Sequence, residues 1–194
     1  MIKSILAGLA IITVTTTACT QDHSIRIGDF EVTAIQDAPS EMNFRLFPKL
    51  SESEFRDLAG SLNAPASVNA FLLTRDGKKI LFDTGNGGQR GTLLQKLEQA
   101  NITPEQIDAI LLTHMHGDHI GGLLDESGKA VFPAATIFVA KLERDYWLSS
   151  ERGASGAMAQ KTIQAYKDRV KVFEFGEEVL PGIKALDAAG HTPG

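Results

Sequence analysis

The residues best suited to chemistry lie in one short stretch, residues 113–119, which reads Thr-His-Met-His-Gly-Asp-His. It holds three of the five histidines in the chain, together with an aspartate. Neutral imidazole is the commonest protein ligand of zinc, and carboxylate oxygen accompanies it well. Four donor side chains within six positions are too many for one tetrahedral ion that also keeps a water. The spacing therefore predicts two divalent ions side by side.

A fourth histidine, His191, lies in Gly-His-Thr-Pro-Gly at the end of the chain. The apolar residues 109–112 predict a buried strand before the motif, and Gly121 and Gly122 follow it where the chain must turn. In α/β folds, ligands generally bind at loops that follow the ends of strands. A lone histidine is usually an ordinary surface or core residue, but a chance match to four fixed positions is rare, which favours a metal site.

Asp83 ends an expected strand and begins a glycine-rich loop, residues 83–88. An aspartate in this position is either a turn former or a functional group, and the sequence leaves both open. The glycines could also suggest a phosphate cradle, but no Gly-Lys-Ser/Thr follows them.

No side-chain nucleophile is indicated, because no Gly-x-Ser-x-Gly occurs and the only cysteine, Cys19, lies near the N-terminus. The expected nucleophile is a metal-bound hydroxide, since divalent ions lower the pKa of bound water from 15.7 to about 7. Asp118 could accept a proton in addition to its main expected role as a ligand.

The composition is that of one globular domain, with 194 residues, 43% hydrophobic and 22% charged. A net charge of −5 and the lack of a Lys/Arg cluster argue against nucleic-acid binding. A small-molecule substrate is expected instead, and a homodimer is compatible with the sequence.

Residues 1–18 are predicted to be a signal peptide, with Lys3, an apolar run over 5–14 and small residues at 16–18 before the cleavage point. Cys19 follows where bacterial lipoprotein signals place the lipidated cysteine, although Thr16 stands where leucine is usual. The sequence thus predicts a bacterial protein exported to the periplasm, either soluble or anchored in a membrane through a lipid on Cys19.

Strands and helices alternate over residues 24–194 and predict a layered mixed α/β domain. The expected strands are 25–27, 30–35, 68–73, 80–82, 109–112, 136–140, 170–175 and 183–186. Capping boxes at 51–54 and 103–106 predict two helix starts, and further helices are expected over 92–100, 142–148 and 158–166. Residues 39–50 show no period and are expected to form a loop.

The motif His114-x-His116-x-Asp118-His119, with Leu-Phe-Asp-Thr-Gly at 81–85 before it and Gly190-His191 after it, resembles the metallo-β-lactamase-fold hydrolases. Several stretches are most similar to the methyl parathion hydrolase and lactonase branch, namely 67–72, 113–116, 121–123, 145–149 and 181–186. The resemblance covers residues 25–194 and implies an αββα sandwich.

Residue roles follow from this resemblance by position. It implies that His114, His116 and His191 hold one ion, and that Asp118 and His119 belong to a second, with zinc the expected metal. Asp83 would orient a ligand histidine, as such centres generally require. Trp147 would lie near the substrate pocket, or serve as a plain core aromatic.

The chain departs from this family at its end. The family continues past Gly-His-Thr-Pro-Gly with a bridging aspartate, a last histidine and the second half of the sandwich. The domain, residues 24–194, is therefore expected to be the N-terminal part only, incomplete at the C-terminus, with apolar sheet surface exposed.

The expected function is zinc-dependent hydrolysis of an ester, a lactone or an organophosphate triester. Two alternatives stay open at this point. One is an iron-dependent oxygenase on the same fold, and the other is an inactive or non-catalytic metal-binding fragment.

Overall fold

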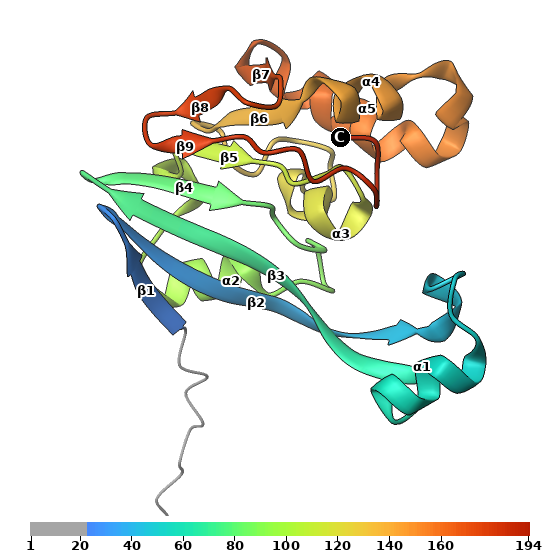
Figure 1. The fold of residues 1–194 in the computed structure, drawn as a ribbon. Coiled ribbons are helices and arrows are strands. Elements are labelled where there is room, and N and C mark those ends of the chain that lie inside the picture. Colours follow the sequence, from blue (N-terminus) through green and yellow to red (C-terminus); the bar gives the residue numbers. More distant parts are fainter. Residues whose placement is uncertain (1–22) are drawn as a thin grey trace, which may run out of the picture.

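A computed structural model of the chain describes residues 23–194, so the predicted signal peptide and Cys19 lie outside the described residues. A seven-stranded sheet runs in chain order from β1 to β7, and a separate ribbon, β8–β9, packs beside it (Figure 1). The strands are β1 (His23–Ile27), β2 (Phe30–Asn43), β3 (Asn63–Arg75), β4 (Lys78–Phe82), β5 (Ala109–Leu111), β6 (Thr136–Ala140), β7 (Val170–Phe173), β8 (Glu178–Leu180) and β9 (Ile183–Lys184). The α-helices are α1 (Glu52–Ala59), α2 (Leu93–Gln99), α3 (Gly117–Ile120), α4 (Lys141–Leu148) and α5 (Ala157–Tyr166). Short 3-10 turns are η1 (Phe44–Leu46), η2 (Pro104–Gln106), η3 (Gly121–Leu123), η4 (Ser150–Gly156) and η5 (Lys167–Arg169).

The sheet is antiparallel from β1 to β4 and parallel from β4 to β7. Parallel neighbours need a crossover connection, and helices provide each one. α2 lies between β4 and β5 in the chain, α3 between β5 and β6, and α4 and α5 between β6 and β7. This arrangement places the residues that follow β4 and β5 at the same edge of the sheet.

Side chains of the central strands alternate between two apolar cores. Leu81, Ile110 and Ile137 belong to the larger core, which also contains helix residues such as Leu97 and Tyr166. Their neighbours along the strands belong to the other core, where Ile80, Leu111 and Phe138 meet Val179, Leu180 and Ile183 of the β8–β9 ribbon. The sheet is therefore covered by helices on one face and in part by the ribbon on the other.

The β8–β9 ribbon covers only part of this face of the seven-stranded sheet. Ile25, Ile27 and Phe71 are 59%, 56% and 43% exposed. Register places them beside Val32, Phe30 and Phe82, which belong to or pack against the ribbon-side core. Apolar side chains on this face of the sheet are thus exposed at these residues.

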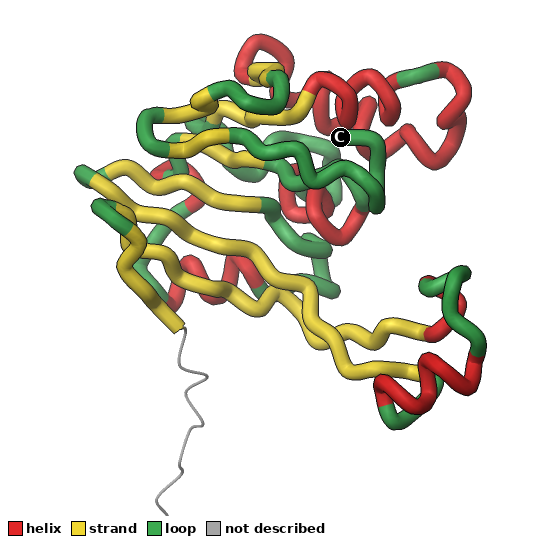
Figure 2. Tube along the Cα trace, in the orientation of Figure 1, coloured by secondary structure: helices red, strands yellow, loops and turns green. Residues whose placement is uncertain are grey.

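The prediction of a loop over residues 39–50 is wrong for residues 39–43. Residues 39–43 continue β2 and pair with residues 63–67 of β3, as an arm that extends away from the rest of the sheet and ends near α1 (Figures 1 and 2). Residues 39–42 are all exposed, so no inward and outward alternation marks them as a strand in the sequence. Backbone pairing with β3, a long-range feature, decides the structure there.

Most other expected elements are confirmed, with local differences. The capping box of Ser51 and Glu54 begins α1, and Gly60, in the left-handed region at φ 75°, ends it. Phe55 of α1 is buried, whereas Leu58 is 78% exposed. The strand expected at 183–186 is shorter, and its partner β8 was not predicted.

No helix in the described part of the chain is both long and apolar enough to cross a membrane.

Candidate metal centre

The residues of the candidate site, ligands and the orienting Asp83, come from three loops. Asp83 follows β4, and the motif at 113–119 follows β5, so parallel pairing brings the two together. His116 precedes the first turn of α3, which carries Asp118 and His119. His191 comes from the segment that follows β9.

Four imidazole rings form one cluster there. Ligand nitrogens of His114, His116 and His191 all lie within 4.8 Å of one another. The His114 ring is central, with centroid distances of 4.8 Å to His116, 3.9 Å to His119 and 4.8 Å to His191. His191 thus lies together with the three histidines of the motif at 114–119.

The donor set fits a metal ion. Nε2 of His114 is buried and has no hydrogen-bond partner among the described residues. A buried polar atom left in this state costs about 1–3 kcal/mol, and a cation would satisfy its lone pair. Nitrogen donors from three histidines are the set that a divalent zinc ion with an open fourth position uses.

A second pair of donors lies beside this triad. Nε2 of His119 is 3.6 Å from a carboxylate oxygen of Asp118, whose side chain is 48% exposed. These two side chains could share an ion next to the first one, while Asp118 stays open to solvent.

Asp83 fixes the orientation of His119. Its Oδ2 lies 2.8 Å from Nδ1 of His119 and accepts the Thr113 hydroxyl at 2.7 Å. Its Oδ1 accepts the Thr113 backbone N–H at 2.8 Å. With Nδ1 occupied, Nε2 of His119 is the atom that faces Asp118. The backbone of Asp83 is in the left-handed region at φ 59°, a strained conformation typical of functional positions.

The environment separates the pKa values of the histidines. Burial, and then the neighbouring His119 and His116 rings, lower the pKa of His114 to about 4. Burial and the nearby His191 also lower the pKa of His116. Burial would lower the pKa of His119 as well, but its hydrogen bond and charge interaction with Asp83 raise it above the usual value. His114 is therefore neutral at pH 7, with a lone pair ready for a metal.

Trp147 lies against the cluster from the core side. Its ring is 5.2 Å from that of His116 and only 7% of the residue is exposed. The indole N–H donates to Glu143 at 2.6 Å. Trp147 is thus a core aromatic that contacts a candidate ligand, and its role in a substrate pocket stays a prediction.

Sequence reasoning missed two buried carboxylates near this edge, Asp37 and Glu143. Asp37, at a register shift in β2, accepts the backbone N–H groups of Asn86, Thr92 and Leu93 at 2.8, 2.8 and 2.9 Å. An acidic residue in a strand or in the first turn of a helix is common on surfaces, so neither residue gave a distinct signal.

The glycine-rich loop packs against α3 rather than forming a phosphate cradle. The Thr84 backbone N–H donates to the His119 carbonyl at 2.8 Å. A Cβ on Gly87 would lie 2.1 Å from the Gly121 carbonyl oxygen, and one on Gly121 would lie 2.2 Å from the Asn86 oxygen. The glycines permit this close backbone approach, which seats the helix that carries Asp118 and His119.

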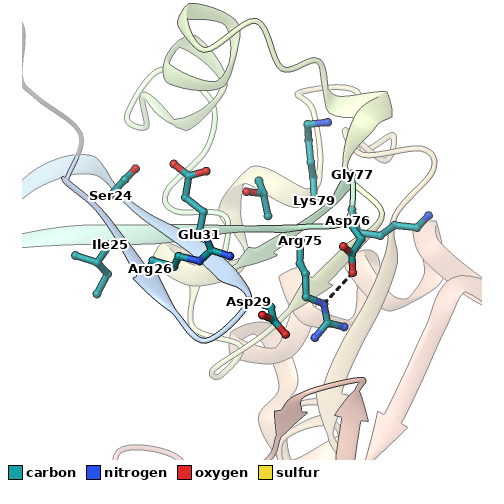
Figure 3. Close-up of a pocket in the computed structure, with 11 residues that line it drawn as sticks. Ser24, Ile25, Arg26, Asp29, Glu31, Arg75, Asp76, Gly77 and Lys79 are labelled. Atoms are coloured by element: carbon teal, nitrogen blue, oxygen red, sulfur yellow. Dashed lines mark ion pairs between the residues drawn. The ribbon is translucent and has the colours of Figure 1, made fainter.

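A large cavity of about 660 Å³ lies away from the histidines, at the turns between β1 and β2 and between β3 and β4 (Figure 3). Charged side chains of both signs line it, including Arg26, Glu31 and Lys79, and Arg75 lies 3.7 Å from Asp76. Its lining among the described residues holds no histidine, so the candidate chemistry stays at the cluster.

Comparison with known proteins is consistent with this geometry. The family model described as the Metallo-beta-lactamase superfamily matches residues 64–194. A solved structure, "AidC, a Dizinc Quorum-Quenching Lactonase, in complex with a product N-hexnoyl-L-homoserine", is 26% identical, with a TM-score of 0.79, over 89% of this chain and 68% of that one. The "hydrolase AbOPH in beta lactamase superfamily" is 31% identical, with a TM-score of 0.74, over 89% of this chain and 67% of that one.

Among curated proteins, the "Probable metallo-hydrolase YqgX" of Bacillus subtilis is 29% identical over 133 residues. This match covers 67% of the chain but 59% of that protein, so the chain spans little more than half the length of this relative.

Proposed function

Because the chain belongs to the metallo-beta-lactamase superfamily, we propose that it is a metal-dependent hydrolase that opens a lactone or cleaves an ester of a small molecule. The observation that carries this proposal is the approach of His114, His116 and His191, whose ligand nitrogens lie within 4.8 Å of one another. Asp118 and His119 lie next to them at the same sheet edge.

In this proposal His114, His116 and His191 hold one divalent ion, and Asp118 and His119 contribute to a second. Such ions, when bound, lower the pKa of water to about 7 and supply hydroxide at neutral pH. The lowered pKa of His114 keeps its ring neutral, so binding releases no proton from it at pH 7. Asp83 holds Nδ1 of His119, so Nε2 would be the ring nitrogen that binds an ion. Zinc suits this set of nitrogen and carboxylate donors.

The substrate class rests on the structural neighbours. One of them is a dizinc quorum-quenching lactonase in complex with an acyl homoserine product, which supports a lactone as the first substrate to test. Aryl esters and organophosphate triesters present a similar electrophilic centre to hydroxide, and they form the second and third test substrates.

The test compares zinc-loaded protein, chelated protein and two alanine variants on these three substrates. His116→Ala removes a candidate ligand, whereas His23→Ala makes the same change at the remaining histidine of the sequence, at the start of β1. We expect hydrolysis that requires zinc, a loss of at least about 100-fold in His116→Ala and near-normal rates in His23→Ala. Equal rates in the two variants would contradict the proposal.

The same assay separates the alternatives. Tight zinc binding without turnover of any substrate would favour a non-catalytic metal protein. Retention of iron with oxygen consumption would favour an oxygenase.

Export is a separate part of the proposal and is supported only by residues 1–19. Cell fractionation tests it, because a lipid anchor predicts that Cys19→Ala moves the protein from the membrane to the periplasmic fraction. An unprocessed protein in the cytoplasm would contradict export.

A further inference from the structure

Glu143 is a buried carboxylate in the first turn of α4, directly behind the histidine cluster. Only 1% of the residue is exposed. A carboxylate removed from water is costly unless hydrogen-bond donors surround it. Its partners should therefore indicate its role.

Those partners are three N–H groups. Oε1 of Glu143 accepts the Met115 backbone N–H at 2.7 Å and the Trp147 indole N–H at 2.6 Å. Oε2 accepts the Gly194 backbone N–H at 3.2 Å. Two of the three donors are backbone groups from segments that are far apart in the chain.

Both segments carry candidate ligands. Met115 lies between His114 and His116, and Gly194 lies three residues after His191. The two oxygens of one carboxylate thus attach separately to the two loops that must meet at a shared ion. Trp147, which also donates to Glu143, packs its ring 5.2 Å from His116 and limits the movement of that ring.

We infer that Glu143 is a positioning residue of the metal centre, which holds the His114–His116 loop and the His191 loop together before the metal binds. This inference rests on the proposed function, since it requires that the three histidines share an ion. A preformed site avoids the cost of ordering the loops on binding. Loss of such outer partners typically weakens metal binding about 10- to 100-fold.

The chemistry of the side chain explains why a carboxylate is present. Glutamate offers an acceptor oxygen on each side, so it can accept from both loops at once. Glutamine has the same shape but one acceptor, and its amide N–H₂ would face either the Gly194 N–H or the Met115 and Trp147 donors. One loop would then lose its attachment.

Two variants test the inference by different routes. Glu143→Gln keeps the volume and removes one acceptor. Gly194→Ala keeps the carboxylate intact, but its Cβ would lie 2.3 Å from the Glu143 backbone nitrogen and would push the His191 loop away. Tyr166→Phe is the matched control, because it deletes a buried hydroxyl that donates to the Leu123 carbonyl at 3.0 Å and touches neither loop.

The readouts are the zinc dissociation constant, measured by competition with a chromophoric chelator, and the thermal unfolding midpoint of the metal-free protein. We expect Glu143→Gln to weaken zinc binding about 10- to 100-fold and Gly194→Ala to weaken it about 10-fold. Tyr166→Phe should lower the unfolding midpoint yet change zinc affinity less than about threefold.

Zinc affinity within about threefold of wild type in Glu143→Gln would overturn the inference and make Glu143 a structural core residue. Should that variant fail to fold, unchanged affinity in Gly194→Ala would overturn it. Hydrolysis, measured on the same samples, separates this result from the proposed function. Weakened zinc binding in the two variants supports the inference even if the wild-type protein hydrolyses no substrate.

Discussion

Nδ1 of His116 lies 2.9 Å from Nε2 of His191, although 75 positions separate these residues in the chain. Nε2 of His114, in the same cluster, is buried and has no hydrogen-bond partner among the described residues. The ligand nitrogens of these three histidines, from two distant loops, lie within 4.8 Å of one another, which is the strongest indication of a metal centre in this protein. The only tryptophan of the chain, Trp147, lies close enough to report on it.

Metal binding should therefore change Trp147 fluorescence. Co²⁺ at this site would quench the indole, because its ring is 5.2 Å from that of His116. We expect saturable quenching in the wild-type protein and at least about a tenfold higher dissociation constant in His191→Ala. A fluorescence titration measures both. His23→Ala is the control and should titrate as wild type, and normal quenching in His191→Ala would show that His191 is not a ligand.

Replacement of Asp83 should affect the second ion more than the first. Asp83 contacts His119 at 2.8 Å, and its side-chain hydrogen bonds are to His119 and Thr113 rather than to the first-ion histidines 114, 116 and 191. Asn tolerates the left-handed backbone at this position, so Asp83→Asn should fold. We expect calorimetry to show one zinc equivalent near wild-type affinity and the other weakened about 10- to 100-fold. Two equivalents of unchanged affinity would remove Asp83 from the site.

Two adjacent glycines should respond very differently to alanine. Gly87 and Gly88 both have positive φ, 63° and 52°, so both substitutions strain the backbone by about 1–2 kcal/mol. Only at Gly87 does the added Cβ meet another backbone atom, the Gly121 oxygen at 2.1 Å, whereas nothing lies within 4 Å at Gly88. We expect Gly87→Ala to lower the free energy of unfolding by about 3 kcal/mol or more, and Gly88→Ala by about 1–2. Urea unfolding compares them, and equal losses would mean that the loop does not pack on α3 in solution.

Alkaline pH should destabilise the fold through Tyr166. Burial raises the pKa of Tyr166 to about 12, whereas the phenol of an unfolded chain ionises near 10. Above pH 10 the unfolded chain therefore binds fewer protons than the folded one, and the free energy of unfolding falls. This contribution is fully present below pH 10 and is lost as pH rises through about 12.

Ultraviolet titration of phenolate formation checks this, and Tyr146→Phe leaves Tyr166 as the only tyrosine. We expect that variant to ionise near pH 12 in the folded state, and Tyr166→Phe to lose part of the alkaline dependence of stability. Ionisation of Tyr166 near pH 10 in folded protein would mean that its hydroxyl reaches water.

The features that could be predicted from sequence are those set by local chemistry. A capping box such as Ser51 with Glu54 satisfies backbone groups within one turn, so it can be predicted from neighbouring residues alone. The motif at 114–119 is readable for the same reason, because its donors are spaced along a single loop and one helical turn. These residues also carry the resemblance that indicates the family.

Other features depend on contacts between distant segments, which patterns of neighbouring residues do not predict. Residues 39–43 form a strand only because β3 lies beside them, and Asp37 turns inward only because the register shifts there. Glu143 has the sequence context of an ordinary surface residue, yet the fold buries it between two loops. By itself the sequence determined which side chains could bind a metal. The tertiary structure decided that His191 meets His116, and which carboxylates hold them, because hydrogen bonds across the sheet edge join segments that are not neighbours in the chain.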